Sequence, residues 1–108
     1  MIDFQRLVGF QWDDGNARKS AEKHGVSQAE TEQVFLNEPL LVTGDDRHSR
    51  IEPRFHALGV TDSGRRLHIT FTVREENTRI RVISARDMHR EERLRYEQET
   101  QDRPPLPD

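Results

Sequence analysis

The segment between residues 67 and 74 alternates strictly between apolar and polar side chains. Successive side chains of a β-strand point to opposite faces of the sheet, so this period of two predicts an antiparallel strand with one buried face. The apolar positions are Leu67, Ile69, Phe71 and Val73, and the polar positions are His68, Thr70, Thr72 and Arg74. The second face of the sheet is therefore expected to be polar, either as a platform for a substrate or as an ordinary solvent-facing surface.

Two more strands are predicted beside this segment. Residues 54–60 and residues 79–85 are rich in β-branched and apolar side chains, and turn sequences separate them from the alternating strand. Asp87 then stands at the N-cap position of a polar helix expected over residues 88–98. The second half of the chain is thus a β-meander followed by a helix.

Two helices are expected in the first half of the chain. Asp13 and Asp14 stand where a helix N-cap stands, and Gly25 is a good helix stop. Ser27 and Glu30 have the spacing of a capping box, which marks the start of a second helix. The expected helices span residues 16–24 and 28–36.

The complete order of elements is β-α-α-β-β-β-β-α. It includes a first strand over residues 4–12 and a short strand over 40–42, which a loop over 43–50 follows. This order indicates an α+β fold with a mainly antiparallel sheet and helices packed on one face. Because 31% of the residues are hydrophobic and 34% are charged, the core is thin and serves one domain, residues 1–101. Residues 102–108 are expected to be a disordered proline-rich tail.

Cysteine and long apolar segments are both missing from the sequence. The absence of cysteine excludes a disulfide framework, a thiolate zinc site and a cysteine nucleophile. No apolar run approaches the ~18 residues that span a bilayer, and the N-terminus lacks the pattern of a secretory signal. We therefore expect a cytoplasmic protein with no membrane partner.

The charge is unevenly distributed. Residues 1–46 carry a net charge of −5, residues 47–95 carry +5, and residues 96–108 carry −3. The basic residues of the middle segment are all arginines, and arginine binds phosphate in a bidentate manner and stacks on bases. The overall charge of −3 thus conceals a segment suited to nucleic acid. The alternative is that these arginines form solvated ion pairs.

Metal and cofactor motifs are not found in the sequence. No two of the five histidines have the i,i+4 spacing of a zinc protease helix. Asp45, Asp46 and His48 are close in sequence, but Arg47 beside them opposes a cation. The chain also has no glycine-rich phosphate loop and no nucleophile elbow. No metal and no cofactor are expected.

Several segments, in order and in register, resemble the BrnT-type toxin family. They include Phe10-Gln11-Trp12-Asp13, Lys23-His24-Gly25-Val26-Ser27, the run from Asp46 to Arg54, Phe71-Thr72-Val73-Arg74, the run from Arg79 to Arg86, and Glu92, Arg93, Tyr96 and Glu97. Two positions depart from that family's pattern, Asn16 and Ser20, and activity would be altered if either residue contacted RNA.

The resemblance implies a RelE-like fold and the toxin of a type II toxin–antitoxin pair. Such a toxin is a ribonuclease that inhibits translation by cutting RNA. The implied partner is a BrnA-like ribbon-helix-helix antitoxin, in a 2:2 complex that binds promoter DNA.

Three arginines on neighbouring predicted strands, Arg54, Arg74 and Arg81, are candidate ligands of the scissile phosphate. Several guanidinium groups around one phosphate stabilise the extra negative charge of the transition state. In the alternative interpretation, Glu52 pairs with one of these arginines and only fixes the sheet.

Candidates for the acid and the base, and for RNA contacts, lie elsewhere in the sequence. His48 and Glu52 stand in or beside the loop before the meander and are predicted as the acid–base pair. Lys23 and His24 are predicted RNA contacts, although His24 also has the position of a helix C-terminal cap.

Arg79 and Arg86 are also predicted RNA contacts, with the alternative that Arg86 pairs with Glu92. Two function classes follow from these candidates. The first is a metal-independent endoribonuclease toxin, and the second is a non-catalytic nucleic-acid-binding or protein-interaction module on the same fold.

Overall fold

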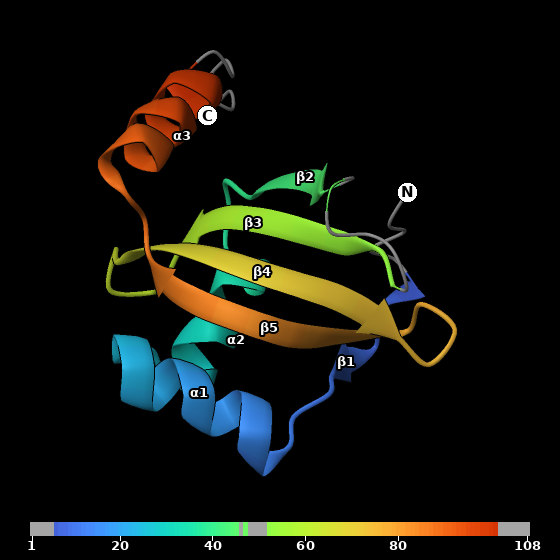
Figure 1. The fold of residues 1–108 in the computed structure, drawn as a ribbon. Helices are drawn as coiled ribbons and strands as arrows, with labels where there is room; N and C mark the ends of the chain where they lie inside the picture. The colour runs from blue at the N-terminus through green and yellow to red at the C-terminus, as the bar shows by residue number, and fades with distance from the viewer. Residues whose placement is uncertain (1–5, 46, 48–51, 102–108) are drawn as a thin grey trace.

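The computed structural model describes residues 6–45, 47 and 52–101, and its order of elements is the predicted one. Figure 1 shows a curved sheet with helices on both sides. The elements are β1 (Gly9–Phe10), α1 (Asp14–His24), α2 (Gln28–Leu36), β2 (Leu41–Asp45), β3 (Arg54–Val60), β4 (Arg66–Arg74), β5 (Arg79–Asp87) and α3 (Arg90–Gln101). The α+β class and the mainly antiparallel sheet are confirmed.

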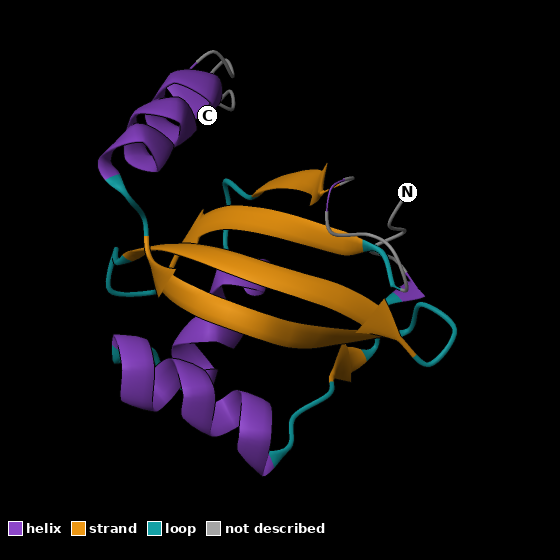
Figure 2. Ribbon diagram, in the orientation of Figure 1, coloured by secondary structure: helices purple, strands orange, loops and turns teal. Residues whose placement is uncertain are grey.

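The five strands form one sheet in the order β1-β5-β4-β3-β2 (Figure 2). The pairs β2–β3, β3–β4 and β4–β5 are antiparallel, as a meander requires, and β1 alone pairs in parallel, with β5. The register of β4 and β5 shifts between Thr70 and Phe71, where Ile83 is left without a partner on β4. This β-bulge bends β5 beside α1.

Several element boundaries differ from the prediction. The first strand is confined to β1, and β2 continues to Asp45, so the first part of the predicted loop is strand. Asp87 ends β5 instead of capping α3, which begins at Arg90. The predicted tail lies outside the described residues.

The main core lies between the sheet and helices α1 and α2. Its buried side chains come from alternate positions of the strands, as the pattern of residues 67–74 predicts, and they include Leu67, Ile69 and Phe71 at 0% exposure. Helix α2 approaches β3 closely, because a Cβ atom added to Gly59 would lie 2.7 Å from Cγ1 of Val34. The glycine thus allows the backbones of α2 and β3 to pack together.

Helix α3 lies on the opposite side of the sheet from α1 and α2, so the helices are not confined to one face. Its Tyr96 packs with Leu58 and Met88 in a second, smaller apolar cluster, and the Tyr96 hydroxyl donates to the Pro39 carbonyl at 2.6 Å. Leu58 follows the core residue Ala57 on β3, and adjacent strand residues point to opposite faces of the sheet. The second cluster therefore lies on the face away from α1 and α2. None of the described helices is long and apolar enough to cross a membrane.

The helix signals at the ends of α1 and at the start of α2 are confirmed. Asp13 is the N-cap of α1, Gly25 ends that helix in the left-handed conformation, and Ser27 and Glu30 form the capping box of α2. The two positions that depart from the family pattern face inward: Asn16 donates to the Val82 carbonyl at 3.2 Å, and the backbone N–H of Ala85 donates to Ser20 Oγ at 3.0 Å. Both are buried, at 7% and 3% exposure, and both serve the α1–β5 junction.

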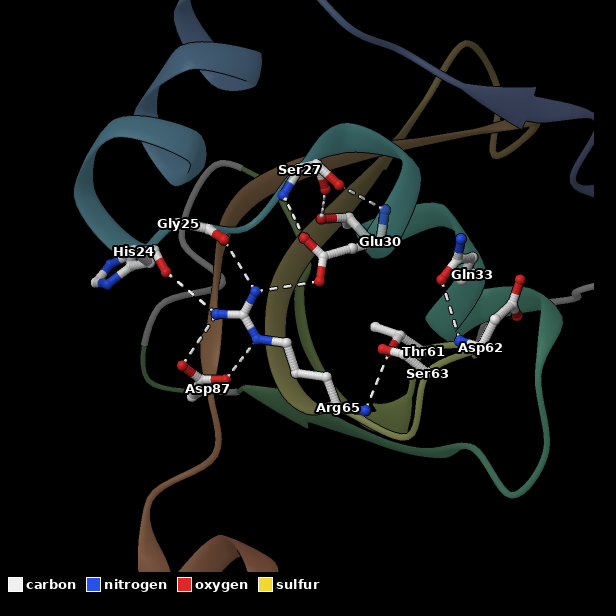
Figure 3. A network of polar contacts seen from close by, with 11 residues as sticks. His24, Gly25, Ser27, Glu30, Gln33, Thr61, Asp62, Ser63, Arg65 and Asp87 are labelled. Carbon is white, nitrogen blue, oxygen red and sulfur yellow. Dashed lines mark hydrogen bonds and ion pairs between the residues drawn. The ribbon is translucent and has the colours of Figure 1, made fainter.

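Arg65 connects α1, α2 and β5 through hydrogen bonds of its guanidinium group (Figure 3). Its guanidinium makes two hydrogen bonds to Asp87 at 2.7 and 3.0 Å and one to Glu30 at 3.1 Å. It also donates to the carbonyls of Gly25 and His24 at the end of α1. The hydrogen bonds from Arg65 hold the pKa of Asp87 below its ordinary value.

Candidate functional site

The sheet face opposite α1 and α2 carries polar side chains from four strands, and we call it the polar face. It comprises Thr43 and Asp45 on β2, Arg54 and His56 on β3, His68, Thr70, Thr72 and Arg74 on β4, and Arg79, Arg81, Ser84 and Arg86 on β5. All five arginines that the sequence analysis proposed as phosphate or RNA ligands lie on this face. Their common orientation follows from the alternation of the strands.

The strand register brings three of these arginines near one another. Arg81 pairs with Thr72 across β5 and β4, and continuing the β3–β4 register by one step places Arg54 on the other side of Thr72. Arg74 lies two residues along β4, opposite Arg79. Strands are ~4.8 Å apart, so the backbones of Arg54 and Arg81 are separated by only about 10 Å. Long side chains from both positions are able to reach one phosphate.

Most of these arginines also contact a carboxylate. The pairs are Arg74 with Glu52, Arg79 with Glu75, Arg81 with Asp13 and Arg86 with Glu92. The Asp13 and Glu75 side chains are 55% and 54% exposed, and exposed ion pairs contribute only ~0–1 kcal/mol. A phosphate is therefore able to compete for Arg79 and Arg81. The contact between Glu52 and Arg74 agrees with the alternative in which Glu52 fixes the sheet.

A histidine–carboxylate pair lies at the centre of the polar face. Nε2 of His56 is 2.8 Å from Oδ2 of Asp45, and Nδ1 of His56 is 3.1 Å from the Thr70 hydroxyl. The carboxylate accepts, so a neutral His56 carries its proton on Nε2 and leaves Nδ1 as an acceptor. The side chains of His56 and Asp45 are 31% and 12% exposed. A partly exposed imidazole oriented by a half-buried carboxylate is suited to proton transfer.

A second histidine, His68, lies beside the first, with ring centroids 5.0 Å apart. Its Nε2 is 3.6 Å from Glu92 of α3, and its buried Nδ1 has no hydrogen-bond partner within the described part of the chain. Burial, together with the charges of Arg86 and His56, lowers the pKa of His68 to about 4 against the opposing effect of Glu92. His68 is therefore neutral in the folded protein at neutral pH.

Glu92 links α3 to this face of the sheet. It accepts two hydrogen bonds from Arg86, at 2.7 and 3.0 Å, and one from the backbone N–H of His89 at 2.7 Å. Burial opposes ionisation of Glu92, but these hydrogen bonds and the charges of His68 and Arg86 outweigh it and lower its pKa to about 2. The alternative in which Arg86 pairs with Glu92 is thus the observed arrangement.

A small cavity of about 100 Å³ opens at the two histidines. His56 and His68 line it from the sheet, and Glu92 and Arg95 line it from α3. Its polar lining places two imidazoles and a carboxylate where a small polar group is able to enter. Arg86 of the polar face adjoins this cavity through Glu92, to which it is hydrogen-bonded.

The described residues among the predicted acid–base and N-terminal RNA contacts lie away from this centre. His48 is outside the described residues, and Glu52 is bound to Arg74. Lys23 and His24 lie in the last turn of α1, on the other side of the sheet, where the His24 carbonyl accepts from Arg65. The structure therefore places the strand arginines together on the polar face, whereas Lys23 and His24 of α1 lie elsewhere.

Sequence reasoning did not single out His56 or Asp45 as site residues, and it mentioned His68 only as part of the polar face. The available signal was the period of two, because His56 occupies a polar-face position on β3 and Asp45 lies on β2. The pairing of β2 with β3 was needed to bring the two side chains together. In residues 6–45, 47 and 52–101, no three potential metal-ligand side chains converge.

The fold and the polar face define a small α+β protein with an arginine-rich and histidine-rich sheet surface, a class suited to phosphate-bearing polymers. Residues 12–92 match a family model described as the ribonuclease toxin BrnT of type II toxin–antitoxin systems. The chain belongs to this family, which confirms the resemblance seen in the sequence. A search among curated proteins finds no match.

Proposed function

We propose that this BrnT family member is a metal-independent endoribonuclease that inhibits translation by cleaving RNA on its polar face. The observation that carries the proposal is the His56–Asp45 pair, because an oriented imidazole lies on the same sheet face as Arg54, Arg74 and Arg81. These groups supply proton transfer and charge stabilisation without a metal.

In the proposed reaction, the ribose 2′-oxygen attacks the adjacent phosphorus and the bond from phosphorus to the 5′-oxygen breaks. A base removes the 2′-hydroxyl proton, and an acid returns a proton to the leaving 5′-oxygen. We assign the base to His56. In this assignment the ribose 2′-hydroxyl replaces the Thr70 hydroxyl at Nδ1, Nδ1 accepts its proton, and Asp45 stabilises the imidazolium. The products are a 2′,3′-cyclic phosphate and a 5′-hydroxyl.

The arginines act on the phosphate. Arg54 and Arg81 flank Thr72, and Arg74 lies in the next row, so the three side chains start from neighbouring backbone positions on this face. Negative charge accumulates on the nonbridging oxygens in the transition state, and each oriented donor there contributes a few kcal/mol. Arg79 and Arg86 extend the basic surface on β5 toward the flanking RNA.

Two residues from the sequence prediction keep proposed roles. His48 is a candidate for the acid that protonates the leaving oxygen, because the chain enters β3 and the polar face shortly after it. Glu52 acts as a positioning residue, since its contact with Arg74 sets the direction of that guanidinium. Lys23 and His24 are proposed as contacts for RNA that extends beyond the sheet.

The family implies an antitoxin partner. We propose a BrnA-like ribbon-helix-helix antitoxin that forms a 2:2 complex with the toxin and binds promoter DNA. Both proteins are proposed to act in the cytoplasm, where RNA and DNA are available to them.

A non-catalytic nucleic-acid-binding or protein-interaction module is the second candidate, because Arg74, Arg79, Arg81 and Arg86 each contact a carboxylate. Growth arrest in cells that express the protein without an antitoxin separates the two. Arg54→Ala, Arg74→Ala and Arg81→Ala are each expected to abolish growth arrest while the protein remains folded. Full toxicity in all three folded variants would contradict the proposed role of the arginines.

A further inference from the structure

A second basic hollow lies beside the polar face, along the junction of α1 and β5. Hydrogen bonds from Asn16 to the Val82 carbonyl and from the Ala85 N–H to Ser20 hold the helix along the strand. The hollow has a volume of about 280 Å³, close to the low end of the ~300–1,000 Å³ of ligand pockets. Its lining residues are Gly15, Asn16, Lys19, Arg81, Val82 and Ile83.

Lys19 differs from the strand arginines in its surroundings. It is exposed, and it contacts no carboxylate among the residues that the structure describes. Lys23 lies one turn further along α1, on the same side of the helix, and is likewise exposed. A phosphate that reaches Lys19 therefore displaces no ion pair, unlike a phosphate that reaches Arg81.

Arg81 connects this hollow with the polar face. It lines the hollow, and it also stands beside Thr72 in the row that contains Arg54. The Arg81 guanidinium lies 2.8 Å from the Asp13 carboxylate, and the Arg81 side chain is 23% exposed. Arg81 thus belongs by register to the row of the proposed scissile phosphate and also lines the hollow, so the two sites share this residue.

The floor of the hollow is apolar. Val82 is buried in the core, and Ile83 is the bulged residue of β5, partly exposed and without a partner on β4. A cationic rim over an apolar floor is the combination that binds single-stranded nucleic acid, in which the rim takes phosphates and the floor takes an unpaired base. A duplex keeps its bases stacked and paired, so it is not able to place a base in this hollow.

We propose that single-stranded RNA flanking the scissile phosphate binds along the α1–β5 junction, with a backbone phosphate on Lys19 and an unpaired base over Ile83. This inference rests on the proposed function and adds a subsite to the same surface. Lys19 is then a binding residue that extends the footprint beyond the polar face, and the toxin recognises an unpaired RNA segment.

The phosphate contact is tested by the salt dependence of binding to a short single-stranded RNA whose 2′-hydroxyls are methylated, which prevents cleavage. Loss of one phosphate contact lowers the slope of log K against log salt by about 0.7 for a single strand. Lys19→Gln is expected to show this decrease. Arg18→Gln is the matched control, because Arg18 is its exposed neighbour but lies on the side of α1 away from Asn16 and β5. Equal slopes for both variants and the parent would overturn the phosphate contact.

The base contact is tested with Ile83→Thr, which keeps a β-branched side chain but removes apolar surface. Ile83→Thr is expected to weaken binding of the methylated RNA and to leave unchanged the binding of an abasic sugar–phosphate strand of equal length. Equal weakening with both strands would overturn the base contact, because the change would then be independent of bases.

Cleavage assays separate failure of the subsite from failure of the proposed function. A dinucleotide spans only the scissile phosphate, so the parent and Lys19→Gln are expected to cleave it equally, while Lys19→Gln cleaves a longer strand more slowly. Equal cleavage of both substrates by both proteins overturns the subsite and leaves the proposed function standing. A parent that neither binds nor cleaves RNA overturns both the subsite and the proposed function.

A peptide-binding assay tests whether the hollow serves a protein partner instead. Weaker binding of an acidic peptide by Lys19→Gln, with RNA binding unchanged, assigns the hollow to a protein partner and overturns the RNA subsite.

Discussion

His56 and Asp45 are joined across β3 and β2 by a contact of 2.8 Å between Nε2 and Oδ2. The two residues stand eleven positions apart in the sequence and lie on diagonal positions of an antiparallel strand pair. The contact fixes the orientation of the imidazole, and the Thr70 hydroxyl at its other nitrogen completes that orientation. This relationship gives the polar face an imidazole of fixed orientation on the same side of the sheet as its arginines, and we have proposed that imidazole as the base.

Replacement of His56 by Asn removes that proton acceptor. General acid–base catalysis contributes about 10²–10⁴-fold to rate, so cleavage of RNA by His56→Asn is expected to fall by this factor. Asp45→Asn is expected to lower the rate less, because it disturbs the orientation of His56 without removing the imidazole. The measurement is the initial rate of cleavage, with circular dichroism to confirm folding. Parental rates in both folded variants would contradict the assignment.

The buried His68 makes stability depend on pH. Its pKa falls from 6.5 to about 4 on folding, chiefly because of burial, so between these pH values the unfolded chain binds a proton that the folded protein does not. The stabilisation is fully present above pH 6.5 and is lost as the pH falls toward 4, by up to about 3 kcal/mol.

Chemical denaturation of the parent and of His68→Gln across this pH range measures the effect. The free energy of unfolding of the variant is expected to vary less between pH 6.5 and 4. A steeper dependence in the variant than in the parent would show that His68 is not the group responsible.

Ser20 is predicted to serve stability and not RNA binding. Ser20→Ala leaves the buried N–H of Ala85 without its acceptor, which costs about 1–3 kcal/mol. Thermal denaturation is expected to show this loss, while RNA affinity stays at the parental value. Ala21→Ser, at the exposed neighbouring position, is the control and is expected to leave stability nearly unchanged. A loss of RNA affinity in folded Ser20→Ala would argue for a functional role.

Arg65 is predicted to hold the α1–α2 junction. Arg65→Lys keeps the positive charge but loses the bidentate contact with Asp87. A single ammonium group is also not able to make the further hydrogen bonds to Glu30, Gly25 and His24 at the same time. The free energy of unfolding is expected to fall by about 1.5–3 kcal/mol. Arg90→Lys provides the comparison at an exposed site on α3. Equal stability of the two variants would show that the network in Figure 3 contributes little.

Most of the fold was predictable because its signals are local. The period of two in β4 identified the sheet and its covered face, and the caps at Asp13, Gly25 and Ser27 placed the ends of the helices. The position of α3 was not predictable from such signals. Its few apolar side chains indicate a helix with one small contact, but not that Tyr96 packs over Leu58 on the other face.

The candidate site was predictable only in part, for the same reason. The arginines follow from strand alternation, which is local, and they share a face as expected. The pairing of His56 with Asp45 depends on the register of β2 against β3, and residues 43–45 were expected in a loop. Because residues 43–45 belong to β2, Asp45 pairs with Arg54 on β3 and lies within contact distance of His56.

Cleavage of RNA by the purified protein in excess EDTA tests metal independence and the role of His56 in one experiment. We predict that the parent cleaves RNA in EDTA at the rate seen without it and leaves a 2′,3′-cyclic phosphate, and that His56→Asn loses this activity. Cleavage that stops on chelation and returns with a divalent cation, in parent and variant alike, would contradict a metal-independent mechanism with His56 as the base.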